Sequence, residues 1–129
     1  MSAVRLFVYG SLRRNAEGGS HPLLADAGFL GPATVPGTLY SVNWYPGLVL
    51  SGDGTVHGEL YELPIARADA MLHALDDYEG GGFRRRKAHV LAALGDASDA
   101  WVYIYDGPVH ALETIASGDY GTPVHRAHP

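Results

Sequence analysis

The chain has 129 residues, of which 47% are hydrophobic and 18% charged, and its formal net charge is −5 at pH 7. This length and composition are typical of one globular domain, taken here as residues 1–129. The acidic balance excludes an extended basic groove for nucleic acid, and a sequence without cysteine has neither disulfides nor thiolate chemistry. No run of about 20 apolar residues and no signal-peptide pattern is present, so we expect no membrane span and a cytoplasmic location.

The first elements predicted are a strand and a short helix. Over residues 4–9 apolar side chains occur at both even and odd positions, so both faces of an extended segment would be apolar. This pattern predicts a strand that is buried on both faces near its end. A short helix is expected over 20–27, because Ser20 and Pro22 are typical of a helix N-terminus and Gly28 of a helix end.

Two longer strands are predicted next, over 33–42 and 56–63. Pro36 marks a sheet edge or a bulge in the first of them. Turn residues at 43–47 and 51–54 lie between the two strands, so a hairpin or meander is the natural arrangement.

The helix predicted from Ile65 has the clearest pattern in the chain. Its apolar residues recur at intervals of three and four up to Glu79. Gly80–Gly82 end it, since glycine readily takes the left-handed conformation of a helix C-cap. The other elements expected are strands at 83–94 and 100–105, a turn at 95–99, a short helix at 109–116 and a loose tail after 120.

Three groups of residues are better explained by structure than by chemistry. Arg84–Lys87 would alternate between the two faces of a strand, which favours a solvated strand over a phosphate site. Trp101, Tyr103 and Tyr105 share one face of a strand and are typical of packing. The seven histidines follow no metal-binding spacing, so we expect no metal.

One candidate for a functional site is Tyr9-Gly10-Ser11-Leu12, at the end of the first predicted strand. The stretch lacks the glycine spacing of a nucleophile elbow or a phosphate loop, so Ser11 is not expected to be a nucleophile. Its backbone N–H groups lie beyond the strand ladder and could hold a carboxylate. Taken alone, however, the stretch is better explained as an ordinary strand-ending turn.

The other candidate is Leu75–Gly80, where three carboxylates fall in the last turn of the predicted helix. Negative charge is unfavourable at a helix C-terminus, and Asp76 and Asp77 are expected to face solvent. Glu79 lies four residues after Leu75, on or beside the buried stripe, where burial and neighbouring acids raise the pKa of a carboxyl. Glu79 is therefore a candidate general base near neutral pH.

Five segments, taken in this order and spacing, resemble the gamma-glutamylcyclotransferase-like family, the group of plant avirulence-induced proteins and gamma-glutamylamine cyclotransferases. They are Tyr9-Gly10-Ser11-Leu12, Tyr45-Pro46-Gly47, Gly58-Glu59-Leu60-Tyr61, Leu75-Asp76-Asp77-Tyr78-Glu79-Gly80 and Ala100-Trp101-Val102-Tyr103-Ile104-Tyr105. The resemblance covers roughly residues 4–120, and Ile115–Tyr120 is similar to the end of small bacterial members.

The resemblance implies an α+β fold, a small mixed β-barrel with flanking helices, without a metal or organic cofactor. It implies cyclisation of a small gamma-glutamyl compound, with release of 5-oxoproline and an amine or amino acid. Glu79 would be the acid/base, and the substrate would be bound by Tyr9, Gly10, Ser11, Leu12 and Tyr105. The chain itself is expected to be a monomer or a homodimer.

One residue departs from the family pattern. Many relatives carry an aromatic hydroxyl soon after the Glu-Gly pair, where this chain has Phe83, so a hydrogen bond from that position is missing.

Alternatives to the enzyme remain open at this point. The same pocket would also serve a non-catalytic binding module for a carboxylate-bearing metabolite, and a third option is a purely structural or oligomeric role. The sequence leaves open which amine is released and whether Tyr103 or Tyr105 faces the cavity, because a one-residue shift reverses the faces of a strand. The enzyme hypothesis requires that Glu79 and the N–H groups of residues 10–12 share one cavity.

Overall fold

The computed structural model describes residues 4–14, 19–42, 45–93 and 95–121. Its strands are β1 Val4–Val8, β2 Gly28–Pro36, β3 Thr38–Val42, β4 Tyr45–Val49, β5 Thr55–Leu63, β6 Phe83–Ala92, β7 Ala97–Tyr105 and β8 Glu113–Thr114. The helical elements are the short 3-10 helices η1 Pro22–Leu24 and η2 Ile65–Arg67 and the α-helix α1 Ala68–Glu79.

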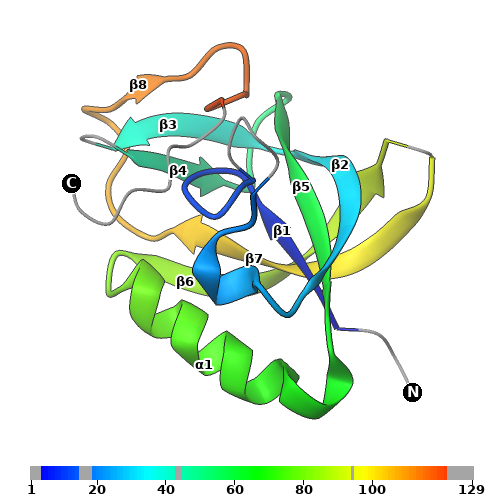
Figure 1. Ribbon diagram of the computed structural model, residues 1–129. Coiled ribbons are helices and arrows are strands. Elements are labelled where there is room, and N and C mark those ends of the chain that lie inside the picture. Colours follow the sequence, from blue (N-terminus) through cyan, green and yellow to red (C-terminus); the bar gives the residue numbers. More distant parts are fainter. Residues whose placement is uncertain (1–3, 15–18, 43–44, 94, 122–129) are drawn as a thin grey trace.

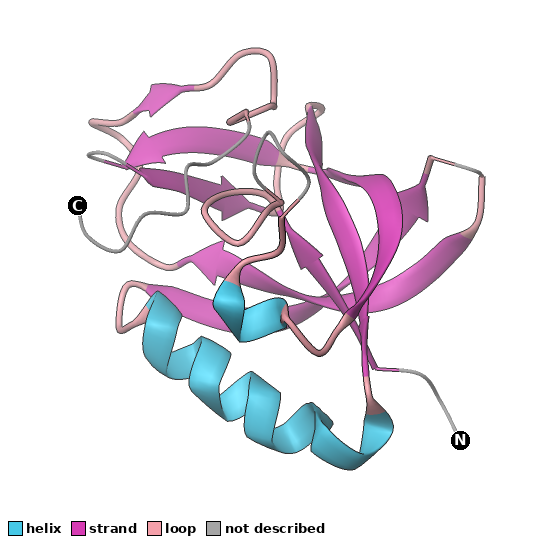
Figure 2. Cartoon of the chain, viewed as in Figure 1, coloured by secondary structure: helices cyan, strands magenta, loops and turns pink. Residues whose placement is uncertain are grey.

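Five of the strands close into a barrel in the order β1-β5-β2-β6-β7, and the other three form a small sheet in the order β4-β3-β8. Strand β1 runs antiparallel to β5 and parallel to β7, so the barrel is mixed. Helix α1 lies along one side of the barrel, and the small sheet covers the opposite end (Figure 1; Figure 2). The expected α+β fold with a mixed barrel is confirmed.

The barrel strand β1 separates two hydrophobic cores. Leu6 and Val8 point toward α1, whereas Phe7 points into the barrel interior, and all three side chains are buried. The strand is therefore apolar on both faces, as the alternation over 4–9 predicts. The core under the helix includes Leu12, Leu24, Tyr61, Leu63, Met71, Leu72, Leu75 and Tyr103, and the interior core includes Tyr9, Val35, Leu39, Leu48, Val56, Leu60, Val90 and Val102.

The helix predicted from Ile65 is present, as one 3-10 turn followed by α1. It ends at Gly80, whose φ of 80° is accessible to glycine at little cost. Its buried residues Ala68, Met71, Leu72 and Leu75 recur at threes and fours and face the barrel. This stripe sets the rotation of the last turn, which carries Glu79.

The strand predicted over 33–42 is wrong as a single element. The chain turns at Gly37, where β2 leaves the barrel and β3 begins in the small sheet. A Cβ at Gly37 would lie 2.6 Å from the Val49 carbonyl oxygen, so only glycine allows this close crossing. Pro36 is the last residue of β2, and the bulge of that strand lies earlier, between Phe29 and Gly31.

Three other local predictions are corrected. The helix expected over 20–27 is the single turn η1, and Gly28 begins β2 instead of ending a helix. The predicted turn 43–47 already contains β4 from Tyr45 onward, and β7 begins at Ala97 inside the predicted turn 95–99.

The helix expected over 109–116 is absent, and the short strand β8 is found there instead. Tyr40 and Ser41 of β3 pair with Thr114 and Glu113, and the Ile115 N–H donates to the Leu39 carbonyl at 2.7 Å. A helix of two turns is weak on its own, so pairing with an available sheet edge prevails. The tail expected to be loose lies outside the described residues beyond 121.

Candidate active site

A cavity of about 370 Å³ opens where the ends of β1, β4, α1 and β7 meet. This volume falls in the lower part of the range of about 300–1,000 Å³ typical of small-molecule sites. The residues that line it come from five segments of the chain: Phe7, Val8, Tyr9, Gly10, Ser11, Leu12, Tyr45, Pro46, Tyr78, Glu79, Gly82, Phe83 and Tyr103.

Glu79 is the only charged residue among the described residues that line this cavity. Within the described part of the chain its half-buried carboxyl makes neither a hydrogen bond nor an ion pair. Burial raises the pKa of this carboxyl from its ordinary 4.5 to about 7, because the charged form loses hydration that no partner replaces. Near neutral pH the group can therefore both accept and release a proton.

Asp76, one turn earlier in α1, has the opposite environment. Arg85 donates to both carboxylate oxygens, from Nε at 2.8 Å and from Nη2 at 3.1 Å, and the Tyr103 hydroxyl donates to Oδ1 at 2.7 Å. The guanidinium of Arg85 and the Tyr103 hydroxyl hold the pKa of Asp76 below its usual range. The expectation that Asp76 simply faces solvent is wrong, whereas Asp77 is exposed.

The loop after β1 forms one wall of the cavity. The Arg13 N–H donates to the Gly10 carbonyl at 3.0 Å, which closes the loop as a turn. Within the described residues no acceptor is found for the N–H groups of Gly10 and Leu12. A Cβ at Gly10 would lie 2.8 Å from Cγ of Pro46, so glycine is what lets the loop lie against β4.

Tyr9 anchors this loop from within the barrel. Its hydroxyl donates to the Tyr103 carbonyl at 2.6 Å and accepts from the Leu48 N–H at 3.1 Å. Burial raises the pKa of Tyr9 far above its ordinary value, so the hydroxyl stays protonated and both bonds persist. The three strands β1, β4 and β7 are thereby joined at the cavity floor.

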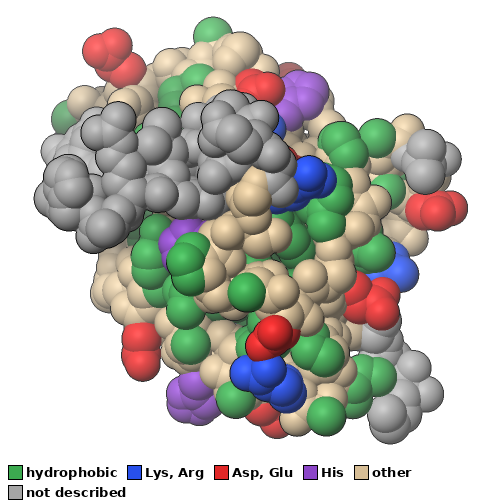
Figure 3. Space-filling view, in the orientation of Figure 1, with side chains coloured by type: hydrophobic (Ala, Val, Ile, Leu, Met, Phe, Trp, Pro, Cys, Tyr) green, Lys and Arg blue, Asp and Glu red, His purple; other side chains and the backbone are tan. Residues whose placement is uncertain are grey.

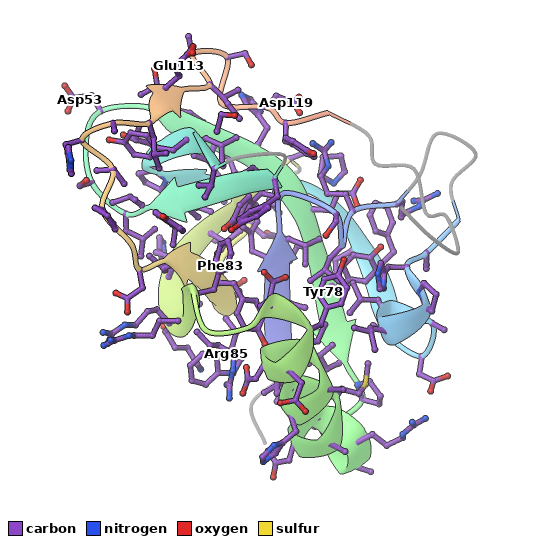
Figure 4. The ribbon with its side chains drawn as sticks, turned by 90° about the vertical axis from the view of Figure 1, so that its left-hand side faces the viewer. Asp53, Tyr78, Phe83, Arg85, Glu113 and Asp119 are labelled. Carbon is purple, nitrogen blue, oxygen red and sulfur yellow. The ribbon has the colours of Figure 1, made fainter. Side chains whose placement is uncertain are left out.

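Hydroxyl groups and aromatic rings both line the cavity. On one side the Ser11 hydroxyl and the Tyr78 hydroxyl lie 2.8 Å apart and share a hydrogen bond. On the other side the rings of Tyr45 and Phe83 pack with centroids 5.8 Å apart. Figure 4 shows Tyr78 and Phe83 on opposite sides of the C-terminal end of α1.

The structure brings together most of the residues singled out in the sequence. Tyr9, Gly10, Ser11, Leu12 and Glu79 line one cavity. Tyr105 is not among the described residues that line it, and its ring packs edge-to-face on Phe83 with centroids 5.7 Å apart. Tyr103 occupies the wall instead, because it lies two residues earlier on the same face of β7, beside β1.

Several lining residues were not singled out as site residues by sequence reasoning. Tyr78 precedes Glu79 directly, and Tyr45-Pro46 belongs to a segment used only for the family resemblance. Phe83 was noted for a missing hydroxyl but given no role. What these residues share in the sequence is an aromatic side chain within or beside a family motif. Such a pattern does not distinguish an aromatic residue that packs in the core from one that lines a cavity.

Basic groups around the cavity are paired with acidic groups in the part of the chain that the structure describes. No three His, Asp or Glu side chains in the described ranges lie close enough together to hold a metal ion. Of the basic run after the helix, Arg84 pairs with Asp106, Arg85 pairs with Asp76, and both Arg85 and Lys87 stack on the ring of Trp101. On the face drawn in Figure 3, basic side chains are few and interspersed with acidic ones.

Every helix in the described ranges is too short or too polar to cross a bilayer.

The fold and this site define the chain as a member of the gamma-glutamylcyclotransferase-like family. Residues 6–122 match the family described as "Gamma-glutamyl cyclotransferase, AIG2-like", so the resemblance inferred from the five segments is confirmed.

Relatives and solved structures agree with this assignment. The gamma-glutamylcyclotransferase family protein YtfP of Escherichia coli K12 is 39% identical over 118 residues, which cover 91% of this chain and 96% of that protein. The solution NMR structure of Escherichia coli ytfP has a TM-score of 0.62 at 42% identity, covering 91% of this chain and 96% of the other. A crystal structure of a mouse AIG2-like protein has a TM-score of 0.70 at 23% identity, covering 94% and 90%, and thus shows the shared fold.

Proposed function

We propose that this protein is a gamma-glutamyl cyclotransferase that converts a small gamma-glutamyl amide to 5-oxoproline and a free amine. The observation that carries the proposal is that Glu79 and the loop of residues 9–12 line the same cavity. The family membership and the description of its relatives support the same reaction type.

Glu79 is proposed as the group that moves the proton. The α-ammonium of the glutamyl group first gives a proton to the Glu79 carboxylate, and the freed amine then attacks the γ-carbonyl carbon. A new C–N bond closes the five-membered lactam while the original amide C–N bond breaks, and the departing nitrogen receives the first proton from Glu79. The cyclising nitrogen then gives its second proton to the Glu79 carboxylate freed by that transfer, and the released amine takes this proton up as an ammonium. The pKa of about 7 suits these transfers near neutral pH.

The loop after β1 is proposed to hold the α-carboxylate of the substrate. The N–H groups of Gly10 and Leu12 have no acceptor within the described residues, and backbone amides of this kind bind anions without a cationic side chain. Binding of the α-carboxylate by the loop fixes one end of the glutamyl group and holds its α-amine close to the γ-carbonyl of the same molecule. This positional gain matters because the attack is intramolecular.

Tyr103 is proposed to support the ammonium end. Its hydroxyl proton is donated to Asp76 at 2.7 Å, so the remaining lone pairs of the oxygen are available to accept a hydrogen bond. An ammonium or amine N–H is a suitable donor, and the neighbouring Glu79 carboxylate adds to the attraction.

The test is the release of 5-oxoproline from a set of gamma-glutamyl amides and dipeptides. We expect wild-type protein to release it from at least one compound and Glu79→Gln to be about 100- to 10,000-fold slower, which is the usual contribution of a general acid/base. Asp77→Asn is the matched control, because it neutralises an exposed carboxylate of the same helix turn outside the cavity. Equal rates for wild type and Glu79→Gln would remove the proposed role.

A second outcome would favour a binding module. Stabilisation by a gamma-glutamyl compound in a thermal-shift assay, without 5-oxoproline and without any effect of Glu79→Gln, would mean that the cavity binds but does not catalyse.

A further inference from the structure

The loop that forms one wall of the cavity is attached to strand β5 through Glu59. Oε1 of Glu59 accepts a hydrogen bond from the Arg14 N–H at 2.8 Å, and Oε2 lies 3.8 Å from Nε of Arg13. Only 13% of the Glu59 side chain and 15% of the Arg13 side chain are exposed to solvent. A hydrogen bond to a carboxylate in such surroundings is stronger than one between neutral groups.

The barrel determines where Glu59 lies. In the antiparallel pairing of β1 with β5, Glu59 is opposite Val8, the last residue of β1. The loop follows Val8 directly, so Glu59 ties the end of the loop to the strand pair from which the loop begins. Glu59 itself is not among the described residues that line the cavity.

Arg13 gives the loop a second attachment. Its Nη1 pairs with Oδ1 of Asp119, labelled in Figure 4, at 2.8 Å. Asp119 lies in segment 115–120, which the proposed reaction does not use. The carbonyl of the neighbouring Gly118 accepts from the His57 N–H of β5 at 2.8 Å. Both attachments of the loop therefore lead to β5.

The residues at the start and at the end of the loop have different surroundings. The N–H of Arg14 and the side chain of Arg13 are bound by carboxylates. Gly10 and Leu12 line the cavity instead, and in the described ranges their N–H groups have no acceptor. A loop that is already fixed binds an anion at a lower entropic cost, because the ligand does not have to order the amides.

We infer that Glu59 is a positioning residue of this site, which holds the loop through Arg14 and Arg13 in the conformation that receives the substrate carboxylate. The inference rests on the proposed cyclotransferase function, with the α-carboxylate of the substrate on the loop. Glu59 acts through the loop and not on the substrate. Its effect is therefore expected on the binding of the glutamyl group and not on the proton transfers assigned to Glu79.

The test compares KM and kcat of two Glu59 variants for the gamma-glutamyl compound that wild-type protein converts fastest. Glu59→Ala removes both contacts and should raise KM about 10-fold, a factor expected for the loss of a hydrogen bond to a charged group. Its kcat should fall less than about 3-fold, because the carboxylate is bound alike in the substrate and in the transition state.

Glu59→Gln is the conservative variant. It keeps an oxygen that can accept from the Arg14 N–H and loses only the charge opposite Arg13, so KM should rise by no more than about 3-fold. This smaller rise decides the matter if Glu59→Ala does not fold.

Glu62→Ala is the matched control. Glu62 also lies on β5 and pairs with an arginine, Arg5, at 3.6 Å, but it is outside the described cavity wall. Its removal should leave KM and kcat as in wild type. General damage to the fold is recognised separately, because a partly unfolded preparation contains less active protein and shows a lower apparent kcat at an unchanged KM.

The outcomes separate the inference from the function beneath it. A wild-type KM in the folded Glu59 variants, or a loss confined to kcat, overturns the inference and leaves the cyclotransferase standing. An equal rise of KM in Glu62→Ala also overturns the inference. If wild-type protein releases 5-oxoproline from none of the gamma-glutamyl compounds, the proposed function and the inference are both overturned.

Discussion

Glu79 owes its chemical character to a position that is half-buried and without a hydrogen-bonding or ionic partner among the described residues. The same helix turn contains three carboxylates, and each meets different surroundings. Asp76 is bound by Arg85 and Tyr103, Asp77 is exposed, and Glu79 faces the cavity without a hydrogen bond within the described residues. Burial raises the pKa of Glu79 to about 7, because the lost hydration of its carboxylate is not replaced by a partner among the described residues.

The raised pKa of Glu79 predicts a pH-dependent cost to stability. A carboxyl whose pKa is 4.5 when unfolded and about 7 when folded favours the folded state while it is protonated. That contribution is present below about pH 4.5 and is lost as the pH rises through 7. Glu79→Gln removes the titration, so this variant should be as stable as wild type at pH 4.5 and more stable at pH 8.5 by up to about 3 kcal/mol.

Urea denaturation of both proteins at the two pH values measures this difference. Parallel stability curves, with a constant gap between wild type and variant, would contradict the raised pKa.

At the scale of elements, the last turn of α1 is fixed to the barrel by a chain of hydrogen bonds. Asp76 accepts from Arg85 of β6 and Tyr103 of β7, and the Tyr103 carbonyl accepts from the Tyr9 hydroxyl of β1. The helix that carries Glu79 and the strand that carries the amide loop are thus tied to the same residue of β7. The relative position of the two proposed functional groups depends on this connection.

Asp76→Asn tests the connection. Arg85 and Tyr103 stabilise the Asp76 carboxylate, so the pKa of Asp76 in the folded protein lies below its ordinary 3.8. The stabilising contribution of this carboxylate is therefore present above about pH 4, and it is lost as the pH falls through the pKa of the folded state. We expect Asp76→Asn to lower the free energy of unfolding by about 1 kcal/mol at pH 7, a modest value because the pair is partly exposed to solvent. The difference should shrink at pH 3.

The control is Asp77→Asn, which neutralises the next residue of the same turn. It should change stability by no more than a few tenths of a kcal/mol, and upward, since negative charge is unfavourable at a helix C-terminus. Equal effects of the two substitutions in urea denaturation would mean that the bonds of Asp76 contribute nothing beyond its charge.

At the scale of the whole molecule, the barrel includes one crossing where two strands approach too closely for a side chain. β1 crosses β5 at Gly58, where the ring of Phe7 packs over the glycine. A Cβ there would lie 2.3 Å from the Val8 carbonyl oxygen and 2.6 Å from the Phe7 ring. Because Val8 leads directly into the loop at the cavity, the closure of the barrel and the shape of the site are linked.

Gly58→Ala should therefore destabilise the protein by about 1–3 kcal/mol, the usual cost of overpacking a close contact. Gly81→Ala is the matched control, because a Cβ at that position meets nothing within 4 Å. The control should be unchanged or slightly more stable than wild type. Thermal and urea unfolding of the two variants decide the matter, and equal stabilities would show that the crossing can relax to accept a methyl group.

Much of the fold and part of the site could be predicted from local patterns. The helix up to Glu79 follows from its three-and-four periodicity, its end from Gly80, and the two-faced burial of 4–9 from its alternation. The same periodicity puts Glu79 beside the buried stripe. These features depend on residues within one or two turns of each other, so the sequence by itself determines them.

Other features were decided only by the tertiary structure, because they depend on which segments meet. The break at Gly37 and the strand β8 in place of a helix result from pairing with distant strands. Asp76 and Asp77 are adjacent and chemically alike, yet only the position of Arg85 and Tyr103 across the barrel tells them apart. Likewise Tyr103 and Tyr105 share one face of β7, yet Tyr103 lines the cavity beside β1 while Tyr105 packs on Phe83.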